Sequence, residues 1–486
     1  MAAIGTRSPV APDQRQNSSD RPYQKGFESL DREVAIDRLP LTGKLPDWLK
    51  GTLVRTGPAR FEVGDQKYRH WFDGLAMLHS FAFIDGNVSY RNRFLHSKAY
   101  DAATREGRIT YSEFATDPCR SIFKRVASVF DPHITDNGNV NVSRIAGHYV
   151  AMTETPLPVE FDREALDTVG VFDYDGDNHQ VHHTTAHPHY DASTQEAFNY
   201  FAHFSRVSSY HAYRVAGESA RRQVFAQVSV KEPAYIHSFG LTENYFVLVE
   251  FPYVVNPLKL LFSGKPFIEN FEWKPGRPAR FLIFRRSDGG LETEATADCF
   301  FAFHHVNAYE EGGQVHVDIA AYKDAGVVKS LYLDNLRGGN GQSLDLPPIQ
   351  LRRYTVPLAG GAATSRVIVD QSLELPRINY KHNGRDYAYA YFAGSDSDLF
   401  FNRLVKVDVR TGAKWTWSED SCYPGEAVFV ASPDARAEDD GVLLSVVLDT
   451  RQSSFLLVLD ASNFKEIARA TVPHSIPFGF HGQYFS

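Results

Sequence analysis

The chain has 486 residues, of which 43% are apolar and 23% are charged, a balance that excludes wholesale disorder and collagen-like or low-complexity structure. The formal net charge is −8, and the absence of a basic tail or stripe argues against nucleic acid as a partner. Three widely spaced cysteines, Cys119, Cys299 and Cys422, exclude a disulfide scaffold and a cysteine-based zinc site and fit a reducing compartment.

The first segment of the chain, residues 1–24, is rich in Ser, Pro, Ala and Gln and has no apolar period, which predicts a mobile tail. It lacks the basic region and apolar core of a signal peptide. No later run approaches the roughly 18 apolar residues of a membrane span. We therefore expect a cytoplasmic protein with one folded domain over residues 25–486.

From about Phe27 onward, short segments rich in Val, Ile, Tyr and Phe alternate with Gly, Asp, Asn and Pro, a pattern typical of strands and turns. Strands are predicted at Ala76–Phe83, Phe198–Phe204, Phe246–Val254, Arg280–Phe284, Gln314–Tyr322, Ile349–Val356, Tyr387–Phe392, Leu404–Val409, Val442–Leu448 and Phe455–Leu459. Pro118–Phe130 is the best helix candidate. So many strands over about 460 residues predict an all-β fold, a seven-bladed β-propeller rather than one sandwich.

Four histidines stand beside aromatic or small residues at predicted strand ends or turns: His187, His237, His304 and His481. A radial fold would bring one histidine from each of several blades to a common axis and so build a metal site. Alternatively, the four are unrelated packed or surface histidines, since no HExxH or paired CxxC signature is present. His189-Tyr190-Asp191 with His237 also fits a two-histidine, one-carboxylate iron site, and the same segment fits a simple turn.

Together with other segments, these contexts resemble the carotenoid cleavage oxygenase family over nearly the whole chain, from about residue 27 to residue 486. The other segments that carry the resemblance are Arg55-Thr56-Gly57-Pro58, with Thr for the family's Asn, His70-Trp71-Phe72-Asp73-Gly74, Glu374–Asn379 and Glu438–Gly441. Asp117-Pro118-Cys119 and His237-Ser238-Phe239-Gly240 are most similar to the animal β-carotene oxygenase branch and its microbial relatives.

The resemblance implies a propeller whose iron-bearing face is capped by loops and short helices, with one Fe(2+) per chain and dioxygen as co-substrate. The iron ligands and catalytic residues that it implies are His187, His237, His304 and His481. It places three carboxylates behind these ligands, at Glu154, Glu374 and Glu426. It also places two residues close to the iron, Thr153 and Phe480. The resemblance does not match His189 and His305 to iron ligands, so it argues against the two-histidine, one-carboxylate site.

The implied activity is cleavage of one double bond of a carotenoid or apocarotenoid to two carbonyl products. A β-carotene-type substrate and central 15,15' cleavage to retinal are favoured. A long apolar substrate requires a tunnel, and the predicted wall residues are Phe114, Tyr235 and Phe303. Three alternatives are a stilbene-cleaving dioxygenase, although we place no Lys to hold the phenol, a retinoid isomerase of the same family, and a non-enzymatic propeller scaffold.

A carotenoid resides in bilayers, so the enzyme is expected to contact a membrane peripherally. Cys119–Phe130 and Asn256–Ile268 carry apolar side chains beside basic ones, as interfacial helices do. The predicted membrane-facing residues are Ile122, Phe123, Val126, Phe130, Leu258, Leu261 and Phe262. Each segment also fits a helix docked on the propeller's own core, and Cys119 is taken as an unmodified thiol.

Overall fold

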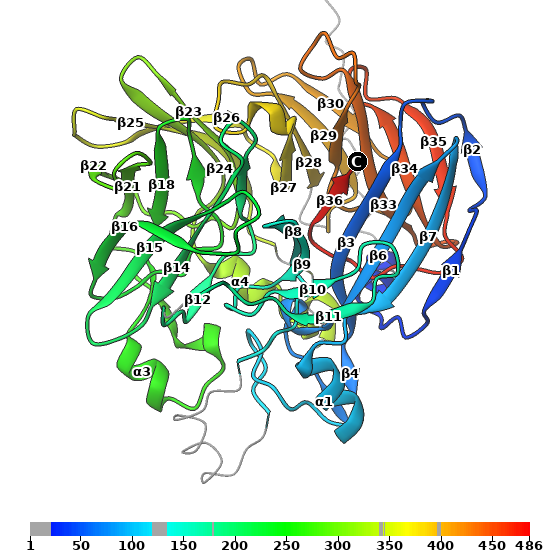
Figure 1. Ribbon diagram of the computed structural model, residues 1–486, viewed down its shortest axis with the longest axis horizontal. Helices are drawn as coiled ribbons and strands as arrows, with labels where there is room; N and C mark the ends of the chain where they lie inside the picture. Colours follow the sequence, from blue (N-terminus) through cyan, green and yellow to red (C-terminus); the bar gives the residue numbers. More distant parts are fainter. Residues whose placement is uncertain (1–20, 119–133, 177–178, 340–343, 345, 396–399) are drawn as a thin grey trace, which may run out of the picture.

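The structure is a computed structural model that describes residues 21–118, 134–176, 179–339, 344, 346–395 and 400–486. Within these ranges, seven sheets of four to six strands stand around a ring, together with two two-stranded hairpins (Figure 1). This arrangement is the predicted seven-bladed β-propeller. Strands β8, β27 and β36 lie near the centre of the ring, and β1, β2 and β22 lie at its rim (Figure 1).

The first four blades follow one another along the chain, and the first also takes in the C-terminal strand. The first contains β1 (Val34–Ile36), β3 (Gly51–Arg60), β6 (Leu75–Ile84), β7 (Asn87–Phe94) and β36 (Gly482–Phe485). The second contains β8 (Asn141–Ile145), β9 (His148–Met152), β10 (Val159–Phe161) and β11 (Thr168–Val171). The third contains β12 (His183–Thr184), β13 (His189–Asp191), β14 (Glu196–His203), β15 (Ser208–Ala216) and β16 (Gln223–Val230). The fourth contains β17 (Gly240–Leu241), β18 (Tyr245–Glu250), β21 (Ala279–Arg285) and β22 (Leu291–Ala297).

Three blades complete the ring. The fifth contains β23 (His305–Glu311), β24 (Gln314–Tyr322), β25 (Ile349–Pro357) and β26 (Thr364–Val369). The sixth contains β27 (Ser372–Ile378), β28 (Tyr389–Ser395), β29 (Arg403–Asp408) and β30 (Lys414–Trp417). The seventh contains β2 (Leu41–Gly43), β31 (Cys422–Pro424), β32 (Val428–Ala431), β33 (Gly441–Asp449), β34 (Ser454–Asp460) and β35 (Glu466–Thr471). The hairpins pair β4 (Glu62–Val63) with β5 (Gln66–Lys67) and β19 (Tyr253–Val255) with β20 (Phe271–Trp273).

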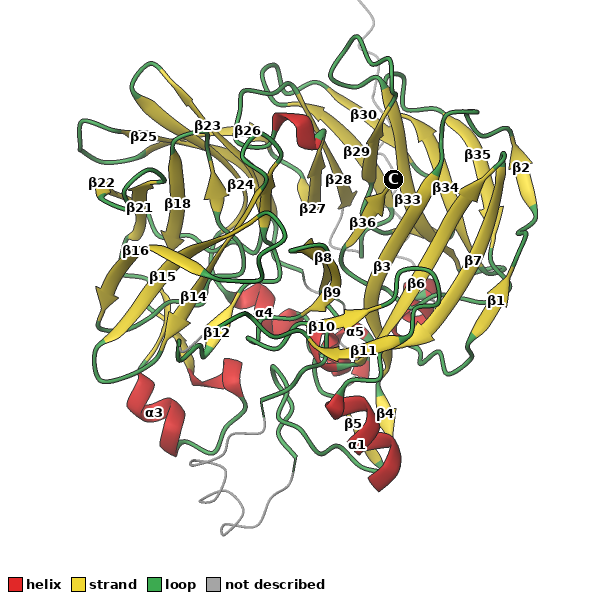
Figure 2. Cartoon of the chain, viewed as in Figure 1, coloured by secondary structure: helices red, strands yellow, loops and turns green. Residues whose placement is uncertain are grey.

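The helices are short and gather mostly on the lower side of the view in Figure 2. The α-helices are α1 (Lys98–Glu106), α3 (Pro257–Phe262), α4 (Gly326–Ser330) and α5 (Leu333–Leu336). The 3-10 helices are η1 (Pro22–Phe27), η2 (Trp71–Asp73), η3 (Phe267–Asn270) and η5 (Tyr380–His382). Apolar side chains of α4 and α5 are buried in the largest core cluster, so these helices cap the propeller rather than extend from it.

The two ends of the chain close the ring. The C-terminal β36 pairs antiparallel with β3, with Arg55 opposite Gly482. The N-terminal β2 pairs antiparallel with β35, with Leu41 opposite Ala470. The first and seventh blades therefore each combine strands from both ends, and a hydrophobic core between them contains Phe81 of β6 and Leu444 of β33.

Most predicted strands match observed ones within a few residues, and β24 matches the prediction at both ends. The predicted strand Phe246–Val254 is in fact two strands, because the chain breaks between β18 and β19 at Pro252, which has no N–H for a sheet ladder. The tail predicted for residues 1–24 is too long, since Tyr23 is buried within η1. The predicted helix Pro118–Phe130 lies almost wholly outside the described residues.

Candidate metal centre

Four histidines reach the centre of the molecule from four different blades. His187 lies between β12 and β13, and His237 precedes β17. His304 and His481 directly precede β23 and β36. Each side chain thus stands where the chain enters the innermost part of its own blade, which is why residues spread from His187 to His481 meet at one place.

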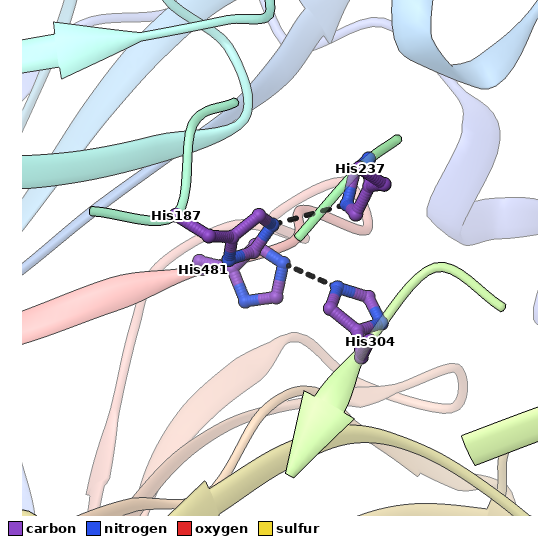
Figure 3. A group of neighbouring side chains, drawn as sticks. All are labelled: His187, His237, His304 and His481. Atoms are coloured by element: carbon purple, nitrogen blue, oxygen red, sulfur yellow. Dashed lines mark hydrogen bonds between the residues drawn. The ribbon is translucent and has the colours of Figure 1, made fainter. Parts of the chain in front are cut away.

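The four imidazoles form one compact group, which we call the histidine cluster (His187, His237, His304 and His481; Figure 3). One ring nitrogen from each lies within 4.8 Å of the other three. The Nε2 atoms of His187 and His237 are 3.0 Å apart, and those of His304 and His481 are 3.1 Å apart (Figure 3). The Nε2 atoms of all four rings therefore converge on a space the size of one ion.

Three buried glutamates lie behind the cluster, and they come from the three remaining blades. Nδ1 of His237 donates to Oε1 of Glu154 at 2.6 Å. Two further glutamates accept from the cluster in the same way: Glu374 from Nδ1 of His304 at 2.5 Å, and Glu426 from Nδ1 of His481 at 2.7 Å. Each of the seven blades thus contributes one histidine or one glutamate to the centre.

These hydrogen bonds decide what the cluster can hold. A carboxylate only accepts, so Nδ1 of each bonded imidazole carries the hydrogen and Nε2 presents a lone pair. The Nε2 atoms of His304 and His481, 3.1 Å apart, would then face each other without a proton between them, and a cation removes this repulsion. Metal-ligating histidines usually donate their second N–H to a carboxylate in this manner. The donor set therefore fits a divalent transition metal, for which imidazole is a suitable ligand.

Three members of the cluster, His187, His237 and His481, are held in the neutral form that metal binding requires. Burial lowers the pKa of His187 and His237 well below the usual value, and the neighbouring imidazoles lower it further. Burial lowers the pKa of His481 to about 4, although Glu426 opposes the shift. Protons are thus weak competitors for the lone pairs near neutral pH.

An apolar cavity lies directly against the cluster. Its wall is formed by histidines of the cluster, by aromatic side chains, and by residues of α4 and of the loop before β25. The lining residues most relevant here are Trp71, Phe72, Phe303, Phe480, Tyr322, Val327, Leu331, Leu346, Phe400 and Phe401. The described lining contains no Lys or Arg, so the cavity suits an apolar ligand.

Of the residues predicted to line the tunnel or the iron pocket, some line this cavity and others do not. Phe303 and Phe480 line the cavity. Phe114 and Tyr235 do not: Phe114 packs on the ring of Phe72, and Tyr235 is fully buried with its hydroxyl 2.8 Å from Oε1 of Glu154. Thr153 directly precedes Glu154, and its predicted role beside the iron stays a prediction.

The alternative iron site proposed around His189 is wrong. Nδ1 of His189 lies 2.8 Å from Oδ1 of Asn383, and Nε2 lies 3.1 Å from the carbonyl oxygen of Phe239. Asp191 pairs with Arg286 at 2.6 Å. Both ring nitrogens and the carboxylate are thus engaged by protein groups away from the cluster.

Two residues that support the glutamates escaped the sequence analysis. The Tyr322 hydroxyl donates to Oε1 of Glu374 at 2.9 Å, and Arg377 lies 3.6 Å from Oε1 of Glu426. Arg377 stands in the Glu374–Asn379 segment that carried the family resemblance, so a basic residue near buried glutamates was a usable signal. Tyr322 ends a predicted strand, and no local pattern distinguishes it from an ordinary core tyrosine.

The first predicted membrane-facing segment, with Ile122, Phe123, Val126, Phe130 and Cys119, lies outside the described residues. In the second, α3 begins at an Asn256 cap, and Leu258 is 56% exposed. The placement of the Leu261 and Phe262 side chains is likewise outside what the structure describes. Among the described helices, none combines the length and apolarity needed to cross a membrane.

Comparisons with known proteins agree with this geometry. Residues 27–486 match the RPE65 family model, described as retinal pigment epithelial membrane protein. The chain is 35% identical to the β,β-carotene 15,15'-dioxygenase of Rattus norvegicus, over 92% of this chain and 88% of the relative. It is 36% identical to the mitochondrial carotenoid-cleaving dioxygenase of Macaca fascicularis, over 91% of this chain and 90% of the relative.

Solved structures give the same fold. A crystal structure of an ACO/RPE65 chimera superposes with a TM-score of 0.86 at 26% identity, covering 96% of this chain and 98% of that one. The structure of cobalt-substituted Synechocystis ACO superposes with a TM-score of 0.84 at 25% identity, with the same coverage.

Proposed function

The chain belongs to the RPE65 family of carotenoid oxygenases, and on that premise we propose that it is an Fe(2+)-dependent dioxygenase that cleaves one double bond of a carotenoid. The observation that carries the proposal is the convergence of four imidazole nitrogens at the wall of an apolar cavity. The preferred substrate is of the β-carotene type, cleaved centrally to retinal, and apocarotenoids are the second substrate class.

Some residues would bind the metal, and others would shield the reacting double bond from water. Fe(2+), when bound by the histidine cluster, would supply the redox chemistry that activates dioxygen. That a similar structure contains cobalt supports a divalent transition metal at such a centre. The three glutamates fix the tautomers of their histidines and offset the charge of the ion. Phe303 and Phe480 keep water away from the reacting double bond.

The reaction needs no acid, base or nucleophile from the protein. One oxygen atom of O2 joins each carbon of the broken double bond, so one alkene and one O2 give two carbonyl compounds. No external electron or proton is consumed, which agrees with a cavity wall that offers mainly apolar side chains beside the cluster.

The cavity wall also separates the carotenoid hypothesis from the stilbene alternative. A conjugated polyene binds through apolar and aromatic contact, which Trp71, Phe72 and Phe401 provide. A phenolic stilbene would be expected to meet a polar or cationic side chain at its ring, and the described lining contains no Lys or Arg.

We further propose that the protein works in the cytoplasm at a membrane surface. Exposed Leu258 on α3, with Lys259 beside it, supports a peripheral contact because interfacial helices combine apolar and basic side chains. Leu258→Glu should lower co-sedimentation with anionic vesicles while leaving metal content unchanged. Equal sedimentation of the variant and the unchanged chain would remove this contact from the proposal.

Product identification tests the function directly. Fe(2+)-loaded protein is incubated with detergent-solubilised all-trans β-carotene under 18O2, and the products are resolved by chromatography with mass detection. Retinal alone, with one labelled oxygen in each molecule, would support central cleavage by a dioxygenase. An apocarotenal with an ionone would support eccentric cleavage instead. Conversion of a retinoid ester without oxygen would favour the isomerase alternative, and no product from any of these substrates would overturn the proposal.

A further inference from the structure

The hydroxyl of Tyr235 is directed at a glutamate rather than at the cavity. It donates to Oε1 of Glu154 at 2.8 Å, the same oxygen that accepts Nδ1–H of His237 at 2.6 Å. The tyrosine oxygen also lies 3.2 Å from Nδ1 of His237. Tyr235 is 0% exposed, so no water competes for this contact, and its ring packs edge-on against Phe114 at 5.8 Å.

A second tyrosine, Tyr322 of β24 in the fifth blade, repeats this arrangement. The Tyr322 hydroxyl donates to Oε1 of Glu374 at 2.9 Å, while Oε2 accepts Nδ1–H of His304 at 2.5 Å. The backbone N–H of Leu375 donates to Oε2 at 2.9 Å. Burial raises the pKa of Tyr235 and Tyr322 well above the usual value, so both hydroxyls are donors throughout the physiological range.

The third glutamate has a different support. Glu426 accepts Nδ1–H of His481 at 2.7 Å and the backbone N–H of Gly482 at 3.0 Å. Arg377 lies 3.6 Å away and supplies a positive charge. Glu154 and Glu374 have no such cation among their described ion pairs, so neutral tyrosine donors take the place of a charge at these two positions.

We propose that Tyr235 and Tyr322 are positioning residues that fix the carboxylates of Glu154 and Glu374 against the Nδ1 atoms of His237 and His304 and thereby strengthen metal binding. A buried carboxylate that loses a donor keeps its desolvation cost. It then turns toward another donor or takes up a proton, and either change weakens its hold on the imidazole. The inference rests on the proposed metal-binding role of the histidine cluster.

Metal affinity tests the inference without an activity assay. Co(2+) is titrated against a chelator into the unchanged chain, Tyr235→Phe and Tyr322→Phe, and visible absorption reports its coordination. Each variant should bind more weakly by about tenfold, the lower end of the loss seen when partners of metal-ligating histidines are removed. The matched control is Tyr253→Phe, since the Tyr253 hydroxyl contacts the carbonyl of Ile268 in the same aromatic cluster, and its affinity should not change.

A double-mutant cycle separates positioning from general packing. In a Glu154→Ala background, Tyr235→Phe should cause no further loss of affinity, whereas Tyr322→Phe should keep its full effect. If Tyr235→Phe fails to fold, the cycle of Tyr322 with Glu374 decides. Unchanged Co(2+) affinity in both tyrosine variants, or additive losses within each pair, would overturn the inference. Failure of the unchanged chain to bind Co(2+) or Fe(2+) would instead contradict the proposed function.

Discussion

At the scale of single residues, a candidate metal ligand differs from a structural histidine in what its ring nitrogens contact. His187 and His189 are two residues apart, yet only His187 directs a ring nitrogen into the cluster. His189 uses both nitrogens on Asn383 and Phe239. Sequence spacing alone cannot separate two such residues, because the difference lies in partners from other blades.

Replacing one member of the cluster should therefore abolish metal binding, and replacing its neighbour should not. We expect His304→Ala to bind no iron, because only three imidazoles would remain and Glu374 would lose its histidine partner. His189→Ala should retain one iron per chain although it loses two hydrogen bonds and some stability. Iron content by elemental analysis of purified protein checks both, and iron retained by His304→Ala would contradict the assignment.

His70 permits a prediction on acid stability away from the metal centre. Its ring is fully buried, with Nε2 2.9 Å from the carbonyl of Val328 and Nδ1 accepting from the N–H of Phe72 at 3.1 Å. Burial lowers the pKa of His70 to about 3. An unfolded chain takes up this proton below about pH 6.5, whereas the folded chain does not, so acidification favours unfolding.

The expected loss of unfolding free energy follows from the pKa shift of His70. Between about pH 7 and about pH 4.5, two pKa units should cost roughly 2–3 kcal/mol of unfolding free energy. His70→Asn lowers stability at every pH but lacks this titration, so its urea midpoint should fall less on acidification than that of the unchanged chain. Parallel declines in the two proteins would contradict the buried neutral state of His70.

At the scale of elements, irregularities in the inner strands direct the site residues. The register of β27 against β28 shifts between Glu374 and Arg377, and Leu375 has a left-handed backbone with φ 53°. A similar shift in β23 follows His305. Bulges often redirect side chains beside active sites. The strand pattern predicted no strand at β27, and the direction of the Glu374 side chain depends on this bulge, which no periodicity reveals.

The contact of β36 with β3 leaves no room for a side chain at Gly482. A Cβ there would lie 2.3 Å from Cγ of Arg55 and 2.8 Å from the carbonyl oxygen of Val54. Gly482→Ala should therefore separate the two strands and displace His481, at a cost of about 1–3 kcal/mol.

Chemical denaturation and iron content measure the two effects of Gly482→Ala together. Gly276→Ala is the matched control, since a Cβ at Gly276 would meet no described heavy atom within 4 Å. Its midpoint and iron content should equal those of the unchanged chain. Normal stability and full iron content in Gly482→Ala would show that β36 can move away from β3 without disturbing the centre.

At the scale of the whole molecule, the ring and its metal centre were predictable to different extents. Alternating short apolar segments and turns predict the all-β propeller but locate only some of its strands, and the resemblance to a known family supplied the four histidines. Phe303 and Phe480 were predicted at this site, but the rest of the cavity wall was not predictable, because residues such as Leu331 and Phe401 come from distant segments that meet only when the ring closes. Tyr235 was assigned to that wall on its aromatic character, whereas its hydroxyl partner, Glu154, comes from another blade.

Closure of the ring is also expected to couple stability to metal binding. β36 completes the first blade, and the histidine cluster joins the first, third, fourth and fifth blades. A chain that ends at His481 retains the whole cluster but loses β36 and its pairing with β3. We expect this truncation to lower the unfolding free energy by several kcal/mol, at about 1 kcal/mol per ladder hydrogen bond.

The truncation should also change the response to metal. A ligand that binds only the folded ring raises its thermal midpoint, so the midpoint of the unchanged chain should rise when Fe(2+) is added under anaerobic conditions. In the chain that ends at His481, the fourth ligand has no strand to hold it, and the midpoint should not respond. Deleting only Ser486, which follows β36, is the control and should preserve the response. A full metal response in the truncated chain would mean that the cluster forms without ring closure, and the coupling between the two would then be absent.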